Sequence, residues 1–158
     1  MRLLNLFAAA LFAATLFASH AFAGEYYGKQ KVVYHINYDS AKAQAGALRN
    51  IQNHINAVGK ENLDLKVVLH GKGLTLLLEP SSSGNTKFSA GNATDAITAK
   101  IAGLKGQGVD FNVCSNTLRG KKVNYEEDLY DVSKADIVPS GVAELAKLQA
   151  EGYAYIRP

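Results

Sequence analysis

The chain has 158 residues, of which 47% are hydrophobic and 20% are charged, and its formal net charge at pH 7 is +3. This length is typical of one domain, and the mixture of apolar and charged residues excludes a disordered or low-complexity chain. The single cysteine excludes a disulfide framework, a thioredoxin-type dithiol and a multi-cysteine zinc site. The charge is too mild to indicate a nucleic-acid partner.

The first 23 residues have the layout of a secretory signal peptide. Arg2 supplies a positive charge, an apolar run extends from Leu3 to Phe17, and Ala21-Phe22-Ala23 places small residues where a signal peptidase cleaves. A retained membrane anchor is the alternative, but polar residues interrupt this segment. We therefore expect a signal peptide over residues 1–23 and a single domain over residues 24–158, exported to the periplasm and free of the membrane after cleavage.

Strand-like and helix-like segments alternate along the exported part of the chain. Segments rich in β-branched and aromatic residues predict strands at residues 32–38, 65–69, 109–114, 137–138 and 153–156. Apolar residues at three- and four-residue spacing predict helices that start after Ser40, near Ala93 and after Ser140, and a shorter helix that starts at Ser115. Helices that connect strands imply a parallel sheet covered on both faces.

Two connecting segments have a less usual composition. Residues 79–92 are rich in serine and glycine and are typical of a mobile loop. Residues 74–78 read Leu-Thr-Leu-Leu-Leu where a loop is expected, and they fit either core packing or a contact surface for another subunit.

Ligands bind to open parallel sheets beyond the carboxyl ends of the strands. The predicted strands place three groups of residues at that edge: Asn37 and Tyr38 after the first strand, His70 and Gly71 after the second, and Cys114 and Asn116 at and after the third. The only cysteine and one histidine therefore come to the same edge, and these residues are candidates for binding or catalysis.

Cys114 has no cysteine partner within the chain, and the periplasm is oxidising. A free thiol there is buried, paired between chains, or used in chemistry, and a small buried side chain at a strand end is the simplest reading. The predicted helix start after Cys114 favours chemistry, because a thiol beside a helix N-terminus and a cation has a lowered pKa. Arg119 is the candidate cation that stabilises the thiolate.

The histidines carry weaker signals. His70 is a candidate acid or base beside the sulfur, although a simple hydrogen bond at a strand end explains it as well. His35 lies in the middle of a predicted strand and favours a hydrogen-bonded core position, and His54 favours a surface position on a helix. His35, His70 and Cys114 are dispersed ligands that make a poor metal signal, so we expect no metal and no other cofactor.

The residues around the cysteine resemble a known family. The stretch Phe111 to Gly120, the turn His70 to Leu74 and the C-terminal run Ile137 to Pro158 are similar to segments of the DsrE/DsrF/TusD sulfur-relay family, and the likeness covers roughly residues 31–158. The resemblance implies a three-layer α/β/α fold with a mostly parallel five-stranded sheet of flavodoxin-like architecture. It also implies homo-oligomers, commonly trimers or hexamers.

In better-understood members of that family, the equivalent cysteine accepts a sulfane sulfur as a persulfide. The resemblance therefore assigns this role to Cys114, whereas no histidine of this chain inherits a role from it. Sulfur-relay members are usually cytoplasmic, so the export signal departs from the family pattern.

Two hypotheses follow for the function. The first is a periplasmic single-cysteine sulfur carrier, or sulfurtransferase-like protein, that takes sulfur from a sulfane donor onto Cys114. The second is a non-enzymatic oligomeric module that binds a small ligand, haem or a protein partner, with Cys114 buried and inert.

Overall fold

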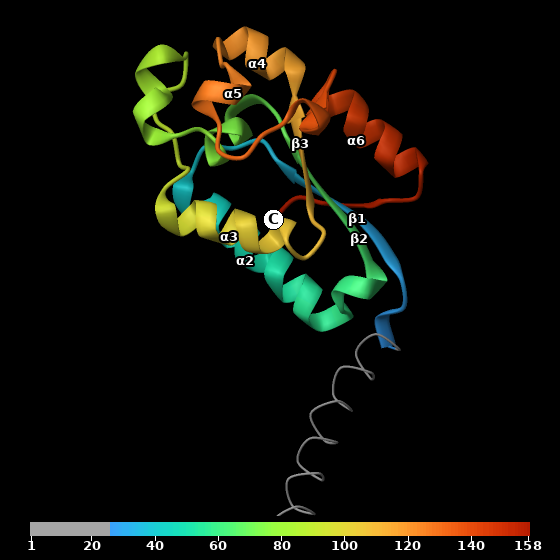
Figure 1. Cartoon of the computed structure of the whole chain (residues 1–158). Helices are drawn as coiled ribbons and strands as arrows, with labels where there is room; N and C mark the ends of the chain where they lie inside the picture. Colours follow the sequence, from blue (N-terminus) through green and yellow to red (C-terminus); the bar gives the residue numbers. More distant parts are fainter. Residues whose placement is uncertain (1–25) are drawn as a thin grey trace, which may run out of the picture.

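A computed structural model describes residues 26–158, and its centre is one parallel sheet (Figure 1). The predicted signal peptide, residues 1–23, lies outside the described residues. The five strands lie in the order β4-β3-β2-β1-β5, and every neighbouring pair is parallel. Their bounds are Gln30–Ile36 for β1, Leu63–Leu69 for β2, Asp110–Cys114 for β3, Ile137–Val138 for β4 and Ala154–Ile156 for β5. The predicted three-layer α/β/α fold with a parallel five-stranded sheet is confirmed.

Helices cover both faces of this sheet. In Figure 1, α2 and α3 lie on one side of the strands and α6 lies on the other, with α4 and α5 beyond the carboxyl edge. The bounds are Ala41–Val58 for α2, Asp95–Lys105 for α3, Ser115–Lys121 for α4, Tyr125–Asp128 for α5 and Gly141–Ala150 for α6. Short 3₁₀ helices occupy Lys60–Asn62, Gly71–Leu76, Pro80–Asn85 and Lys134–Asp136. Among residues 26–158, no helix combines the length and the apolar composition needed to span a bilayer.

The two predicted serine caps fix where α2 and α6 begin. The side-chain oxygen of Ser40 accepts a hydrogen bond from the Ala43 N–H at 3.3 Å, and that of Ser140 accepts one from Ala143 at 3.4 Å. Each bond satisfies an N–H group that has no partner within its helix. The α6 cap matters most for function, because it sets the position of Gly141.

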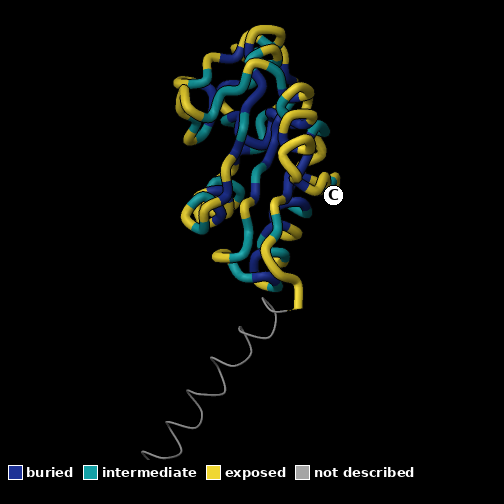
Figure 2. Tube along the Cα trace, turned by 90° about the vertical axis from the view of Figure 1, so that its right-hand side faces the viewer, coloured by how far each residue is buried: buried dark blue, intermediate teal, exposed yellow. Residues whose placement is uncertain are grey.

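The strands bury side chains on both faces, which explains why the sequence shows so little alternation. The α2 and α3 face carries apolar residues of every central strand, among them Ile36, Leu69 and Val113. The opposite face has a smaller apolar cluster: Val33, Val68, Leu145, Leu148 and Tyr153. Figure 2 shows the buried strands between helices whose outer surfaces are exposed.

The segment Leu74 to Leu78 belongs to the core. All four of its leucines are fully buried against the α2 and α3 face. Of the two alternatives that the sequence allows, core packing is therefore correct. Gly73 makes this packing possible, because a Cβ atom there would lie 1.9 Å from the carbonyl oxygen of Ile36.

Several strand boundaries shift by one or two residues from the prediction, and two differences from the prediction matter for the architecture. The first strand ends at Ile36 rather than at Tyr38, so Asn37 and Tyr38 lie wholly beyond the sheet. Part of the expected loop over residues 79–92 folds as the 3₁₀ turn Pro80–Asn85, and a bond from the Lys87 N–H to the Lys121 carbonyl, 2.8 Å long, ties this segment to α4. Local serine and glycine content does not show such a long-range bond.

Candidate functional site

Cys114 and His70 are neighbours at the carboxyl edge of the sheet. The β2–β3 register pairs Leu69 with Val113, so the residues that follow these two lie side by side. Side chains alternate along a strand, and Leu69 and Val113 point into the larger core. His70 and Cys114 therefore lie on the α6 side of the sheet.

Gly141, the first residue of α6, packs on both side chains. A Cβ atom at this position would lie 2.9 Å from the Cβ of His70 and 3.3 Å from the Cβ of Cys114. Only a residue without a side chain lets the helix approach so closely. The start of α6 is thus held directly over the cysteine.

The Cys114 thiol is buried, with 4% of the residue exposed. Burial raises the pKa of this thiol, but hydrogen bonds from the N–H groups of Gly141, Thr117 and Asn116 and from the Thr117 hydroxyl outweigh burial and bring the pKa below its ordinary value. These donors come from the first turns of both α4 and α6. They stabilise negative charge on the sulfur, and no charged group of residues 26–158 is among the causes of the shift.

The Thr117 hydroxyl has a defined direction. Its oxygen accepts a hydrogen bond from the Gly71 N–H at 2.8 Å. The hydroxyl proton is therefore free to point to the sulfur, where it lowers the pKa of Cys114. Gly71, which the sequence predicts as a binding residue, acts here on Thr117.

A hydrogen-bonded chain of three aromatic side chains lies on the same face of the sheet. The Nε2 atoms of His35 and His70 are 2.7 Å apart, and the Nδ1 atom of His35 lies 2.6 Å from the Tyr155 hydroxyl. The two imidazole rings stack with centroids 4.7 Å apart. The chain runs from Tyr155, which is 42% exposed, to His70 beside the cysteine.

Both imidazoles favour the neutral form. Burial, the positive charge of a protonated His70 and the Arg157 guanidinium lower the pKa of His35 to about 4. Burial also lowers the pKa of His70. At neutral pH the pair therefore carries no charge, and one of the two rings donates its Nε2–H to the other.

Arg119 acts on the first turn of α4. Its guanidinium donates hydrogen bonds to the Ser115 hydroxyl at 2.9 Å and to the side-chain oxygen of Asn116. The groups that shift the pKa of Cys114 are N–H groups and a hydroxyl, and Arg119 is not among them. The contacts of Arg119 thus make it a support of the turn that carries three of those donors.

The predicted residues after β1 contact the C-terminus of the chain. The side-chain oxygen of Asn37 accepts two hydrogen bonds from Arg157, at 3.0 and 3.3 Å, and the Tyr38 hydroxyl donates to the Pro158 carbonyl at 3.2 Å. These bonds fix Arg157, whose charge acts on His35. The structure brings Asn37 and Tyr38 to the outer part of the site, two strands away from Cys114.

The histidine pair is not arranged as a metal site. Tetrahedral nitrogen ligands about 2.0–2.1 Å from a zinc ion lie roughly 3.3 Å apart, farther than the two Nε2 atoms. Across residues 26–158, no group of three or more His, Cys, Asp and Glu side chains is placed to hold a metal ion. His54 does not belong to the hydrogen-bonded series of Tyr155, His35 and His70. It is half-buried and contacts the Tyr34 hydroxyl at 3.0 Å and Gln30 at 2.8 Å.

Sequence reasoning missed four contributors to the site: Gly141, Thr117, Tyr155 and Asn112. Thr117 carries a local signal, because it lies three residues after a cysteine that precedes a helix, the spacing at which a side chain meets the first turn. Asn112 lies on the same face as Cys114, and its side-chain oxygen is buried without a hydrogen-bond partner in the described part of the chain. No local pattern identifies Gly141 or Tyr155, because β4 and β5 bring them to the site.

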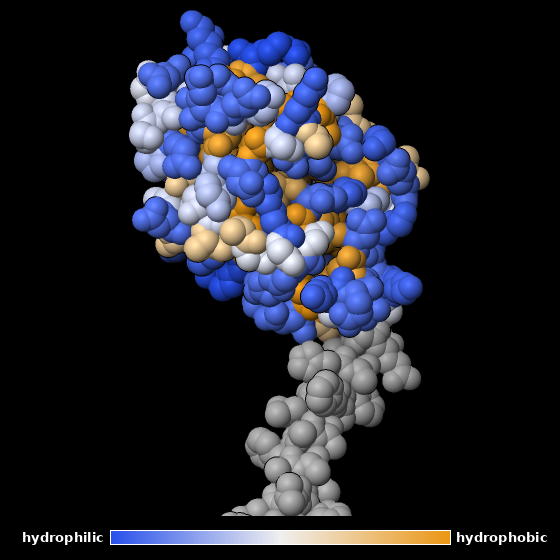
Figure 3. Space-filling view, in the orientation of Figure 1, coloured by the Kyte–Doolittle hydropathy of each residue, from blue (hydrophilic) through white to orange (hydrophobic). Residues whose placement is uncertain are grey.

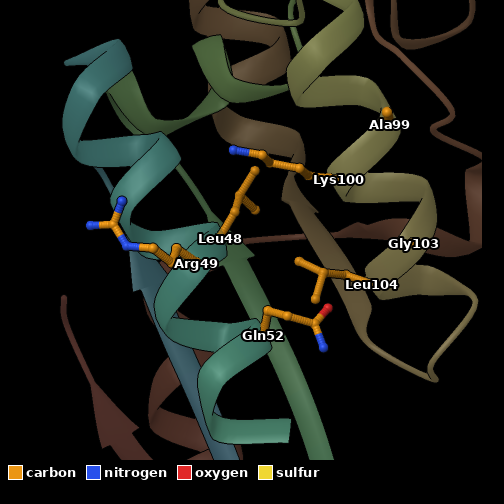
Figure 4. Close-up of a pocket in the computed structure, with 7 residues that line it drawn as sticks. All are labelled: Leu48, Arg49, Gln52, Ala99, Lys100, Gly103 and Leu104. Atoms are coloured by element: carbon orange, nitrogen blue, oxygen red, sulfur yellow. The ribbon is translucent and has the colours of Figure 1, made fainter. Parts of the chain in front are cut away.

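A groove lies on the opposite face of the sheet from Cys114. Between α2 and α3 there is a groove of about 380 Å³, with Leu48 and Leu104 in its floor. In Figure 4 the Lys100 side chain extends from α3 toward α2, and Gln52 and Leu104 approach each other lower in the groove. Around it, Figure 3 shows a mostly polar surface in which apolar side chains appear between the elements. None of the predicted site residues lines this groove.

Comparisons with known proteins agree with this architecture. A model of the DsrE/DsrF-like family matches residues 30–158. Among solved structures, the chain is similar to a protein of unknown function, MTH1491, from Methanobacterium thermoautotrophicum, with a TM-score of 0.65 and 31% sequence identity over 82% of this chain and 100% of that one. No curated protein matches the sequence.

The chain therefore belongs to the DsrE/DsrF-like family, as its resemblance predicts. Membership suggests a role related to sulfur relay. The site that could support such a role is the buried, hydrogen-bonded Cys114 with the imidazole pair beside it.

Proposed function

We propose that the protein is a periplasmic sulfur carrier that holds a sulfane sulfur on Cys114 as a persulfide. One observation supports this proposal above the others: hydrogen-bond donors from α4 and α6 converge on the sulfur and lower its pKa. An inert thiol needs no such donors, since a buried cysteine in apolar surroundings has a raised pKa.

The loading step is a displacement at sulfur. The Cys114 thiolate attacks a terminal sulfane sulfur of a polysulfide or of thiosulfate, forms the new S–S bond and breaks the old one. With thiosulfate, the products are the Cys114 persulfide anion and sulfite, so charge and atoms balance and no outside oxidant is needed. The same N–H donors then stabilise the persulfide anion, because it carries its charge close to where the thiolate did.

Burial restricts the donor. Because only 4% of Cys114 is exposed, we expect a small anion to reach the sulfur more readily than a folded donor protein does. His70 is the proposed acid or base, because burial favours its neutral imidazole, in which one ring nitrogen donates a proton and the other accepts one. Arg119 supports the first turn of α4 through Asn116 rather than contacting the sulfur.

Location and assembly belong to the same proposal. The signal-peptide layout of residues 1–23 supports export to the periplasm. The resemblance to sulfur-relay proteins supports a homo-oligomer, a trimer or a hexamer, whose partner is a sulfane donor or another small ligand.

Intact-mass measurement tests the proposal. Incubation of the mature protein with polysulfide is expected to add about 32 Da, one sulfur atom, which dithiothreitol removes. The Cys114→Ser variant, treated in parallel, is the control and gains nothing. A wild-type protein that also gains no reducible sulfur contradicts the proposal and favours the alternative of a binding module with an inert, buried cysteine.

A further inference from the structure

We infer that Tyr155, His35 and His70 form a proton relay that connects the Cys114 site to solvent, with Tyr155 and His35 as positioning residues that set the proton on His70. This inference rests on the proposed sulfur chemistry and extends it to two side chains that the sequence does not indicate. It stands on the continuous hydrogen-bonded chain from an exposed hydroxyl to the imidazole beside Cys114.

The hydrogen bonds allow two arrangements of protons. In the first, the Tyr155 hydroxyl donates to Nδ1 of His35, His35 donates its Nε2–H to His70, and His70 carries its own proton on Nδ1. In the second, every bond runs the other way, and Nδ1 of His70 is an open acceptor. Both arrangements are neutral, so a switch between them moves a proton along the chain without leaving a buried charge.

The first arrangement is the expected resting state. A phenol hydroxyl is a stronger acid than a neutral imidazole N–H, so the 2.6 Å contact favours donation from Tyr155 to His35. The structure gives Nδ1 of His70 no hydrogen-bond partner among the described residues, so in this arrangement its proton is not held by another side chain.

One cycle of loading and unloading uses both arrangements. During loading, Nδ1–H of His70 gives its proton to the leaving polysulfide anion. His35 passes its Nε2 proton to His70, Tyr155 passes its proton to His35, and a solvent water gives a proton to Tyr155 and becomes hydroxide. This gives the second arrangement, and the proton released to solvent during unloading neutralises the hydroxide. During unloading, a thiol acceptor loses its proton to Nδ1 of His70, attacks the outer sulfur and releases Cys114 as a thiolate, and the relay returns one proton to solvent.

The charged surroundings favour this neutral mechanism over a resting imidazolium. Arg157 acts on His35 from the C-terminal segment, and protonation of one imidazole opposes protonation of the other. Among the described residues, the titratable or charged groups that contact or act on the pair include Tyr155, Arg157 and Cys114, and Asn37 holds Arg157 in place.

The test combines kinetics with the tautomer of His70. Tyr155→Phe removes only the hydroxyl. Tyr27→Phe, three residues before the start of β1, is the matched control because it makes the same change on a 50% exposed tyrosine. We expect Tyr155→Phe to slow polysulfide loading of Cys114 about tenfold, which is less than the full effect of a general acid. We also expect the loading rate to depend less on pH. Nitrogen chemical shifts should report Nδ1–H on His70 in the wild type and a shift toward Nε2–H in Tyr155→Phe. Tyr27→Phe should match the wild type in both measurements.

The outcomes separate the relay from the carrier. If the wild type loads sulfur but Tyr155→Phe loads at the same rate with the same pH profile, the relay is wrong and the carrier stands, whatever the tautomer. His35→Phe provides a second test, since it also breaks the chain and should slow loading at least as much. If the wild type gains no sulfur at all, the proposed function is wrong and the relay falls with it.

Discussion

The two faces of the sheet differ in what their buried side chains can do. Under α2 and α3, the side chains that the three central strands contribute are mainly apolar, and the leucines of residues 74–78 close the end of this core. Under α6, the apolar cluster begins at Val33 and Val68, but toward the carboxyl edge it gives way to His35, His70 and Cys114.

Because of this difference, one face of the sheet supplies most of the stability and the other holds the reactive side chains. Polar groups are costly to bury, so a face that holds imidazoles, a thiol and an unpartnered asparagine oxygen contributes less to folding than an apolar face does. The hydrogen bonds among His35, His70 and Tyr155 offset part of that cost. The fold thus depends on one face and places its reactive groups on the other.

A substitution in the apolar face should have the largest effect on stability. Leu69 is fully buried, and Leu69→Ala is expected to lower the free energy of unfolding by about 3 kcal/mol through lost burial and a new cavity. Urea denaturation measures the change. Val142→Ala, at a position that is 64% exposed, is the control and should change stability by less than about 0.5 kcal/mol. Equal losses of unfolding free energy in Leu69→Ala and Val142→Ala would contradict the claim that the apolar face stabilises the fold.

Gly141→Ala should damage the reactive face. The new methyl group would lie 2.9 Å from the Cβ of His70, so α6 must shift and withdraw its N–H from the sulfur, which raises the pKa of Cys114. We expect a loss of about 2 kcal/mol in unfolding free energy together with slower thiol alkylation at neutral pH.

Gly103→Ala is the matched control, because a Cβ there meets nothing within 4 Å and the position lies within α3. It should raise stability by about 0.5–1 kcal/mol. Unchanged thiol reactivity in Gly141→Ala would show that α6 does not act on the sulfur.

Thr117→Val tests the hydroxyl alone. The variant keeps the shape of the side chain but leaves the Gly71 N–H without its acceptor, which should cost about 1 kcal/mol, and it raises the pKa of Cys114. A pH series of alkylation rates measures the second effect. Thr98→Val, which removes a hydroxyl from an exposed bond on α3, should leave the thiol pKa unchanged. A wild-type alkylation profile in Thr117→Val would exclude the hydroxyl as a donor to the sulfur.

The histidine pair should make stability depend on pH. The pKa of His35 is about 4 in the folded chain, below the ordinary value of 6.5, so the unfolded chain binds more protons between these values. The free energy of unfolding should therefore be at its full value above pH 6.5 and fall as the pH decreases toward 4. His35→Phe should reduce this slope, since it also removes the charge that opposes protonation of His70. Thermal melts at several pH values measure this dependence of stability on pH. If the wild type and His35→Phe lose stability equally as the pH falls, His35 is not a source of the dependence.

Residue patterns alone predicted most of the architecture. Strand-like runs, the Ser40 and Ser140 caps and the three- and four-residue spacing are local signals, and each one leads to an element that the structure contains. The fold also brings His70 and Cys114 to one edge, because parallel strands end there together.

The rest of the site depends on distant contacts that no local pattern reports. Tyr155 reaches His35 because β5 pairs with β1, and Gly141 reaches Cys114 because α6 follows the short strand β4 at the edge of the sheet. Arg119 looked like a thiolate partner by spacing alone, yet hydrogen bonds within its own helix direct it elsewhere. The sequence likewise left the exposure of Cys114 open, since burial depends on the helix that covers it.

The most direct measurement of the central claim is the alkylation rate of Cys114 by iodoacetamide in the native protein as a function of pH. If converging N–H and hydroxyl donors hold the sulfur as an anion, the folded protein reacts at neutral pH and the midpoint of the profile lies below the ordinary pKa of a cysteine. If the thiol reacts only after denaturation, or if its midpoint in the native state lies at or above the ordinary pKa, Cys114 is an inert core residue and the carrier account is wrong.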